Sequence, residues 1–519
     1  MKKRIVSIFV CISVMISCFA ASCITSNAAS ERMHTPTVYL SGQGANVYAE
    51  KGNNKSDILY PPDINVSEFL KSSMVLNEPL AKGLAFNDWD DWCDTFVGLV
   101  NPLLTPFSLD KNGNASNGSG VSKTSAVKNK KAADGTFGFK DYHYSYDWRV
   151  DPCESADGLN TYIKQVKEKT GYGKINLLGR CIGANVVLAY LQKYGSDDIN
   201  KVILYCAGID GFELVGKIFT GDMYFDGDAI NRFADNYLTD IDYAEDDTYS
   251  VIFDLINILN SLKTLNIAIG AFENIYDKVY QNVLPRMIIE SFATMPSFWS
   301  LIGDDYYEAA KDFVFGDNKD EYSELIGKID NYHYNVLNKT RQIIDNCKAN
   351  GAQVYNVVKY GLQIVPIIKN TELQSDSMLE VVSASGGAVC SPVTKTFSKK
   401  YISEANKNGT YKYISPDKQI DASTAYLPDN TWFIKDCSHL HMPDVIDTLF
   451  AAIVDYDGYM TVFDDPDFPQ YLLYTKGEET LTPLSSENSN TNSEWGIGFF
   501  RHIISLIKSL FKMLFSNIK

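Results

Sequence analysis

Apolar residues along the chain occur in short continuous runs and in longer stretches with helical spacing. The short runs predict strands, and they stand at 35–48 ("TPTVYLSGQGANVY"), 141–149 ("DYHYSYDWR"), 174–179 ("KINLLG") and 201–208 ("KVILYCAG"). Between them, helical periodicity predicts helices at 154–171 and 184–195, each with a glycine at its end. Strands that alternate with helices through short links are typical of the α/β class with a parallel sheet.

The rhythm changes between residues 210 and 340, where the long amphipathic stretch 250–292 carries helical spacing and few strands are predicted. We interpret 210–340 as a helical insertion that interrupts the sheet. The sheet resumes at "AQVYNVVKYGLQIVPII" and "NTWFIKDCSHLH", and "MPDVIDTLFAAIVD" predicts its last helix. These patterns divide the chain into a first core part (35–209), an insertion, and a second core part (341–475).

The end of the chain has a different character. A polar linker, 476–495, leads into residues 496–519, where apolar residues share one helical face and cations lie on the other. The apolar face holds Phe500, Ile503, Ile504, Ile507, Leu510, Phe511, Leu514 and Ile518; the cations are Arg501, Lys508, Lys512 and Lys519. We expect a helix that lies in a membrane interface rather than spanning it. The alternative is a helix docked on its own domain or on a partner.

The first 28 residues read as a secretory signal peptide, with "MKKR" before an apolar run and "SNAAS" at the cleavage site. A lipid-modified Cys18 or Cys23 is the alternative. We therefore expect a secreted or extracellular protein, associated with the cell surface through its tail. Removing the three basic residues of the leader takes the net charge from −17 to −20. So acidic a chain excludes nucleic acid as the expected partner, because phosphates must be neutralised by Lys and Arg.

Seven cysteines remain after the leader is removed, and an odd number in an exported protein indicates at least one free thiol. The sequence contains no CxxC pair, no P-loop and no HExxH motif, and "GQGANV" lacks the third glycine of a dinucleotide fingerprint. We therefore expect no metal and no cofactor. Disulfide pairing and oligomeric state stay open.

A candidate for chemistry lies between a predicted strand and a predicted helix. "GRCIG" (179–183) fits the pattern G-x-[S/C]-x-G of the nucleophile elbow, with Cys181 at its centre. In such a turn the backbone N–H of the next residue, Ile182, faces the position of an oxyanion, and the helix N-terminus favours a thiolate. The alternative is a buried structural cysteine before an ordinary helix.

A cysteine nucleophile needs a base, and the chain holds six histidines. In α/β hydrolases the order along the chain is nucleophile, acid, histidine, and the histidine follows the last major strand. His439 and His441 fit that position, and Asp376 in "LQSDSMLEVVSASGG" fits the acid, with a solvated loop aspartate as the alternative. The second oxyanion donor should come from the loop after the first strand, at Gln43 or Gly44.

The segment "YDWRVDP" (146–152) precedes the elbow by the length of one short helix, and "DWDDWCDTF" (88–96) lies further upstream. Together the two segments resemble the lecithin:cholesterol acyltransferase family. The order of elements agrees over about residues 35–450. The resemblance implies an α/β-hydrolase fold with a largely helical cap, a late aspartate and a His-x-x-Met segment. "HLHM" (439–442) is similar to that segment and favours His439 over His441. The chain departs from the family at Cys181, usually serine, at Arg180, usually histidine, and at Ser377, where glycine is common.

These features predict an exported acyltransferase or lipase-type enzyme that acts on lipid esters through Cys181, His439 and Asp376, with a thioester intermediate. An alcohol, an amine or water could resolve that thioester. The alternative is a catalytically inactive protein of the same fold that binds lipid or a surface partner.

Overall fold

The computed structural model describes residues 35–42, 46–49, 58–60, 72–115, 118–121, 142–223, 283, 286–287, 291–366 and 368–488. The expected signal peptide (1–28), the amphipathic tail (496–519) and Gln43 lie outside these residues. None of the helices in the described ranges is long and apolar enough to cross a membrane.

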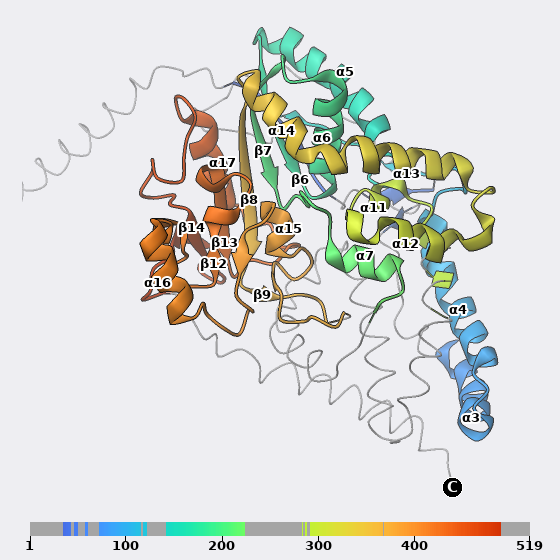
Figure 1. The fold of residues 1–519 in the computed structure, drawn as a ribbon. Coiled ribbons are helices and arrows are strands. Elements are labelled where there is room, and N and C mark those ends of the chain that lie inside the picture. Colours follow the sequence, from blue (N-terminus) through green and yellow to red (C-terminus); the bar gives the residue numbers. More distant parts are fainter. Residues whose placement is uncertain are drawn as a thin grey trace, which may run out of the picture.

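An eight-stranded sheet forms the centre of the molecule, in the order β15-β14-β13-β8-β7-β6-β1-β5 (Figure 1). Neighbouring strands are parallel except for the last pair, β14 and β15. The strands are β1 (Thr37–Leu40), β5 (Tyr142–His143), β6 (Ile175–Arg180), β7 (Ile199–Tyr205), β8 (Gln353–Tyr360), β13 (Thr431–Lys435), β14 (Tyr471–Thr475) and β15 (Thr480–Pro483).

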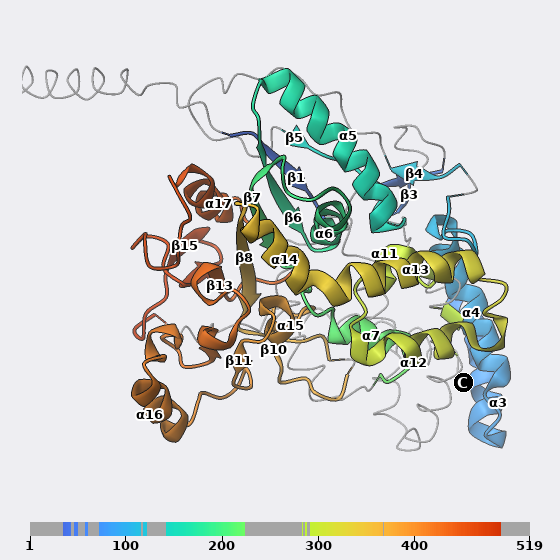
Figure 2. The ribbon, with the colours of Figure 1, turned by 45° about the horizontal axis from the view of Figure 1, so that its top comes forward.

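Both faces of the sheet are covered, which explains why the central strands are apolar without interruption. On one face pack α5 (Pro152–Thr170), α6 (Ile182–Tyr194) and α14 (Thr340–Ala349), and α17 (Ile446–Asp455) packs on the other (Figures 1 and 2). Alternate strand residues contribute to the two cores because side chains point to opposite faces. Toward α5 and α6 lie Leu177, Val202, Leu204, Val354 and Val358, and toward α17 lie Leu178, Ile203, Tyr205, Tyr355 and Val357.

Local signals set the ends of α5. Asp151 accepts a hydrogen bond from the N–H of Cys153, Pro152 occupies the first turn, and Gly171 ends the helix at φ 76°. Each is a preferred residue at its position, because the cap satisfies a free N–H, proline has none to lose, and glycine tolerates a positive φ.

The strand expected over 141–149 pairs with β1 only at Tyr142 and His143. The chain then turns, and the buried Arg149 side chain holds the turn with two hydrogen bonds to Asp147, at 2.9 and 2.7 Å, and one to the carbonyl of Phe107 at 2.8 Å. The "YDWR" stretch is therefore a buried structural clamp ahead of α5.

The described part of the insertion is helical, as the sequence predicts. It contains α7 (Glu213–Phe219), α11 (Pro296–Trp299), α12 (Asp304–Phe315) and α13 (Ser323–Asn335). Trp299 forms the centre of its core, with the rings of Phe219 and Phe315 each at 5.1 Å. In sequence, this cap begins after β7 and ends where α14 begins.

The sheet extends beyond the predicted boundary at residue 475, because β15 pairs antiparallel with β14 through Leu472↔Pro483. A smaller lobe lies between β8 and β13. It contains the antiparallel pair β11 (Val389–Cys390) and β12 (Ile420–Asp421) and helix α16 (Lys399–Asn408), whose Tyr401 hydroxyl donates to the Asp421 carboxylate of β12.

The order of strands identifies the crevice where a ligand can bind. β1 lies between β5 and β6, so the chain leaves β1 toward one edge and leaves β6 toward the other. In open α/β sheets such a switch point, at the carboxyl ends of the strands, is where ligands bind. Gly42 and Cys181 follow β1 and β6 at this point.

Candidate active site

Cys181 occupies a strained turn between β6 and α6, with φ 50° and ψ −125°. Residues other than glycine rarely adopt a positive φ, and those that do cluster at functional sites. The two glycines of "GRCIG" allow the close packing around it. A Cβ at Gly183 would lie 2.5 Å from the carbonyl oxygen of Leu40, and one at Gly179 would lie 2.8 Å from the Cα of Ala184. The two glycines of the pattern therefore each have a steric cause.

The loop after β1 approaches the same turn. A Cβ at Gly42 would lie 2.9 Å from the Cβ of Cys181, so no larger residue fits there without movement. The backbone N–H of Ile182 lies close enough to the Cys181 side chain to lower the pKa of its thiol, as expected for one donor of an oxyanion hole. The expected second donor, Gln43, lies outside the described residues.

Asp376 and His439 are brought together from different parts of the second core part. The Nδ1 atom of His439 lies 2.7 Å from Oδ2 of Asp376, and both side chains are buried. The backbone N–H of His439 donates to the carbonyl oxygen of Asp376 at 2.6 Å. The N–H groups of Met378 and Leu379 donate to Oδ1 of Asp376 at 3.1 and 2.8 Å, which fixes the carboxylate.

The side chain of His439 also lies close enough to Cys181 for each group to shift the pKa of the other, which brings Cys181, His439 and Asp376 into one arrangement. Burial alone would raise the pKa of the Cys181 thiol, but His439 and Arg180 bring it below its ordinary value. Burial would likewise lower the pKa of His439, but the Asp376 carboxylate and Cys181 raise it to about 9. These shifts favour a thiolate–imidazolium pair, the reactive form of a cysteine nucleophile.

Burial would raise the pKa of Asp376, yet His439 and the N–H of Leu379 hold it below its ordinary value. The carboxylate is therefore charged near neutral pH. A charged acid beside Nδ1 keeps the other ring nitrogen of His439 directed at Cys181.

His441, the alternative base, takes no part in this arrangement. Its Nε2 atom lies 2.6 Å from the hydroxyl of Tyr474, and its carbonyl oxygen accepts a hydrogen bond from Lys359 at 2.6 Å. Of the two candidate histidines, His439 is the one placed next to Cys181.

Two residues at the site have roles that the sequence did not reveal. The guanidinium of the buried Arg180 donates from Nη2 to the carbonyl oxygen of His439 at 2.7 Å. The ring of Phe212 meets the ring of His439 edge to face, with centroids 5.8 Å apart. Arg180 stands out in sequence only as a departure from the family pattern, and no local signal marks Phe212.

Phe212 also joins the cap to the acid loop. It precedes α7, whose first N–H, from Glu213, donates to Oε1 of Glu380 at 2.9 Å. Glu380 lies four residues after Asp376, and burial raises the pKa of its carboxyl to about 7. The first cap helix and the loop that carries the acid are thus tied by one buried carboxyl group.

Replacing Arg180 tests whether it acts on the thiol, on the histidine, or on both. Arg180→Gln removes the cation and the bond to His439, so we expect a higher Cys181 pKa and a kcat/KM about 10- to 100-fold lower, the range for one charged hydrogen bond. Arg180→Lys keeps the cation and should largely restore the pKa but not kcat/KM. The measurement is the rate of Cys181 alkylation against pH, beside ester turnover. An unchanged alkylation profile in Arg180→Gln would show that the cation does not act on the thiol.

One group near the site has the donor types of a metal centre. Ligand atoms of Cys206, Asp376 and His439 all lie within 4.8 Å of one another. A cation there would have to displace the hydrogen bond between Asp376 and His439. It would also meet the ammonium of Lys359, which lies close enough to lower the pKa of Cys206 against the raising effect of its burial. Asp376 and His439 therefore fit an acid–base pair better than these two residues and Cys206 fit a metal site.

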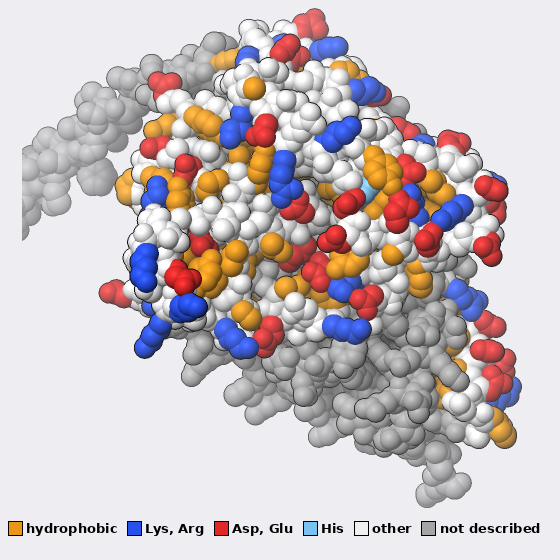
Figure 3. Space-filling model, in the orientation of Figure 1, with side chains coloured by type: hydrophobic (Ala, Val, Ile, Leu, Met, Phe, Trp, Pro, Cys, Tyr) orange, Lys and Arg blue, Asp and Glu red, His pale blue; other side chains and the backbone are white. Residues whose placement is uncertain are grey.

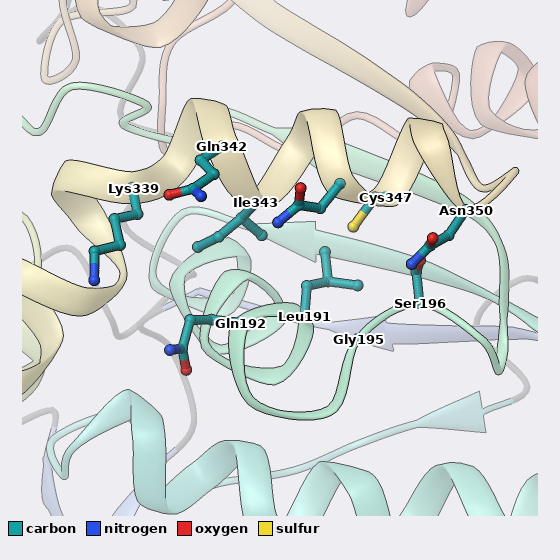
Figure 4. Close-up of a pocket in the computed structure, with 10 residues that line it drawn as sticks. Leu191, Gln192, Gly195, Ser196, Lys339, Gln342, Ile343, Cys347 and Asn350 are labelled. Carbon is teal, nitrogen blue, oxygen red and sulfur yellow. The ribbon is translucent and has the colours of Figure 1, made fainter.

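A separate hollow lies between the carboxyl-terminal end of α6 and α14, and Figure 4 shows its lining residues. It has a volume of about 250 Å³, and four of its ten lining residues have amide side chains, beside the buried thiol of Cys347 on α14. Cys181 is at the opposite end of α6, so this hollow is no part of the candidate active site.

Comparison with known proteins agrees with this architecture. A family model described as "alpha/beta hydrolase fold" matches residues 117–239, which include the elbow and the strands on both sides of it in sequence. No curated protein matches the chain. A chain in "The crystal structure of Tle4-Tli4 complex" is similar at 10% identity and a TM-score of 0.26, over 63% of this chain and 74% of that one, and a likeness at that level carries no argument. The parallel sheet with its flanking helices and the family match together show that the protein has the α/β hydrolase fold.

Proposed function

We propose that the protein is an exported enzyme that transfers or hydrolyses the acyl groups of lipid-like esters through a thioester on Cys181. The fold supports a function of the hydrolase or acyltransferase type. The observation that carries the finer proposal is the buried chain of contacts from Asp376 through His439 to the thiol at the strained turn.

In the first step the thiolate sulfur of Cys181 attacks the ester carbonyl carbon. A carbon–sulfur bond forms, and the carbonyl oxygen becomes an oxyanion that the N–H of Ile182 can stabilise. When the intermediate collapses, the carbon–oxygen bond to the alcohol breaks. The imidazolium of His439 donates its proton to that oxygen, so a neutral alcohol leaves and a thioester remains.

In the second step an acceptor resolves the thioester. Neutral His439 takes a proton from the acceptor, an alcohol or water, while the oxygen of that acceptor attacks the thioester carbonyl carbon. The carbon–sulfur bond then breaks, and the thiolate of Cys181 is regenerated beside the protonated His439. A thioester reacts readily with alcohols and amines, so transfer is as natural an outcome as hydrolysis.

The location of the reaction is part of the same proposal. The leader at 1–28 supports export, and the cationic amphipathic tail at 496–519 supports contact with a membrane surface. A substrate drawn from that surface would be a lipid ester, as the resemblance to the lecithin:cholesterol acyltransferase family also implies.

Intact-mass spectrometry during incubation with a p-nitrophenyl acyl ester tests the thioester directly. We expect the wild-type protein to gain the mass of one acyl group and to release nitrophenolate in a burst. Cys181→Ala should gain none, because no sulfur is present at the turn. Added alcohols can then be ranked as acceptors by the rate at which the adduct disappears.

Cys153→Ala is the matched control, because Cys153 is also a half-buried free thiol, and burial raises its pKa. It should acylate as the wild type does. If the wild type forms no adduct and releases no more nitrophenolate than Cys181→Ala, with both short and long acyl chains, the enzyme proposal is wrong. The inactive lipid- or surface-binding protein then becomes the better reading.

A further inference from the structure

One segment of the small lobe between β8 and β13 reverses the charge of the protein. Residues 391–419 contain six lysines and two acids, a net charge of +4, whereas the whole chain carries −17. All six lysines are exposed: Lys395, Lys399, Lys400, Lys407, Lys412 and Lys418. Figure 3 shows blue side chains gathered over α16, which we call, together with the rest of 391–419, the α16 lobe.

Three of these cations share one face of α16. At about 100° of turn per residue, Lys399, Lys400 and Lys407 lie within about 100° of one another, on the side away from the buried Ala405. Glu404 is the one acid on that face, and its carboxylate lies 4.0 Å from Lys400. Within the described ranges, Lys399 and Lys407 have no ion-pair partner, so their charges face solvent.

Aromatic rings lie beside the cations. The ammonium of Lys412 lies 4.4 Å from the ring centroid of Phe463 and 4.6 Å from that of Tyr413. Phe463 and Tyr411 are 49% and 46% exposed. Lysines that border exposed aromatic rings are typical of surfaces that meet lipid headgroups, where the ring enters the interface and the cation meets phosphate.

The α16 lobe is fastened to the edge of the sheet that carries the active site. Asp417 accepts hydrogen bonds from Lys435 at 2.8 Å and from the hydroxyl of Tyr360 at 3.0 Å. These two residues end β13 and β8, and His439 follows Lys435 by four positions. The lobe and the candidate nucleophile therefore lie at the same, carboxyl, end of the strands.

The cap carries the opposite charge on the other side of the molecule. Residues 304–330, which include α12, hold nine acids and three lysines, a net charge of −6. Figures 1 and 2 both show α16 and α12 at opposite sides of the sheet. Near an anionic surface this separation of charge would turn the α16 lobe toward the surface and the acidic helices away from it.

We propose that the α16 lobe binds the anionic phospholipid headgroups of a membrane and so orients the carboxyl end of the sheet toward it. The exposed rings favour a lipid surface over a soluble polyanion, which needs only the charge. The contact is separate from the tail at 496–519. It also does not rest on the catalytic proposal, because the lysines lie outside the Cys–His–Asp site.

Vesicle co-sedimentation with the full mature chain tests the proposal. The probes are vesicles of phosphatidylcholine alone and of phosphatidylcholine with 30% phosphatidylglycerol. We expect binding to the anionic vesicles that weakens with salt, since the Debye length falls. Lys399→Glu/Lys400→Glu/Lys407→Glu should bind them about 100-fold more weakly or worse, because each of the three lysines near such a surface contributes about fivefold.

The control variant is Lys164→Glu/Lys169→Glu/Lys174→Glu. It makes the same change in net charge with three exposed lysines on α5 and just before β6, at the amino end of the strands. It should bind as the wild type does, and both variants should keep the circular dichroism spectrum and the unfolding midpoint of the wild type, which shows that they fold. Equal loss in both variants, or no loss in the α16 variant, would overturn the proposal. So would binding of the wild type to soluble polyphosphate but not to anionic vesicles.

Discussion

Turnover of a p-nitrophenyl ester by His439→Ala should fall about 10²- to 10⁴-fold, the contribution typical of a general acid–base group. The second effect is on the thiol itself. The wild-type pKa of Cys181 lies below its ordinary value because His439 stabilises the thiolate. At each pH below the ordinary thiol pKa, iodoacetamide should therefore alkylate wild-type Cys181 faster than it alkylates the variant. In the variant the rate should rise about tenfold per pH unit up to the ordinary thiol pKa or beyond it, because burial raises the pKa of Cys181 once His439 is gone.

His441→Ala provides the control, because that ring is hydrogen-bonded to Tyr474 and not to the thiol. It should keep both the turnover and the alkylation profile of the wild type. If His439→Ala instead keeps its turnover while His441→Ala loses it, the base has been assigned to the wrong histidine.

Asp376→Asn should lower kcat/KM about 10³- to 10⁴-fold, although the side chain keeps its size. The amide can still accept from the N–H groups of Met378 and Leu379, but an NH₂ group beside Nδ1 of His439 forces the wrong tautomer. Asp421→Asn is the control, because Asp421 is also buried and accepts from the hydroxyl of Tyr401 at 2.8 Å. Comparable loss in the control would mean that buried carboxylates act here through stability alone.

The same substitution predicts a pH dependence of stability. The pKa of His439 is raised from 6.5 to about 9 in the folded state, so its pairing stabilises the fold fully below about pH 6.5 and fades as the pH rises through 9. The pKa of Asp376 is lowered from 3.8, so its contribution is lost as the pH falls below that value. The difference in unfolding free energy between wild type and Asp376→Asn should therefore be largest between about pH 4 and 6.5. Urea denaturation at pH 6 and pH 9.5 measures it, and an equal difference at both would contradict the assigned pairing.

Local signals explain what the sequence could predict. The elbow is a turn of five residues in which close packing requires two glycines, and α5 carries its own capping residues, Asp151 and Gly171. The buried runs that became β6 and β7 are apolar because both faces of the sheet are covered. These features depend on neighbours in sequence, so periodicity and turn chemistry suffice to find them.

The choice between His439 and His441 shows where such reasoning ends. Both stand in one short segment after β13, and two residues of spacing do not separate them. Their roles differ because the ring of His441 is hydrogen-bonded to the hydroxyl of Tyr474. Tyr474 lies in β14, a strand that the periodicity did not indicate. Arg180 is a similar case, since its bond to His439 joins residues 259 positions apart. Contacts of this kind are set by tertiary packing and leave no local trace.

The positive φ of Cys181 has a consequence for attempts to engineer this protein. A side chain held at φ 50° costs of order 1–3 kcal/mol, and only glycine would relieve it. Selection of variants for thermal stability alone should therefore favour glycine at position 181, because such a screen rewards relaxed backbone and is blind to chemistry. The replacement that the backbone prefers has no side chain at all and so no nucleophile, and at this turn foldability and reactivity make opposite demands on a single residue.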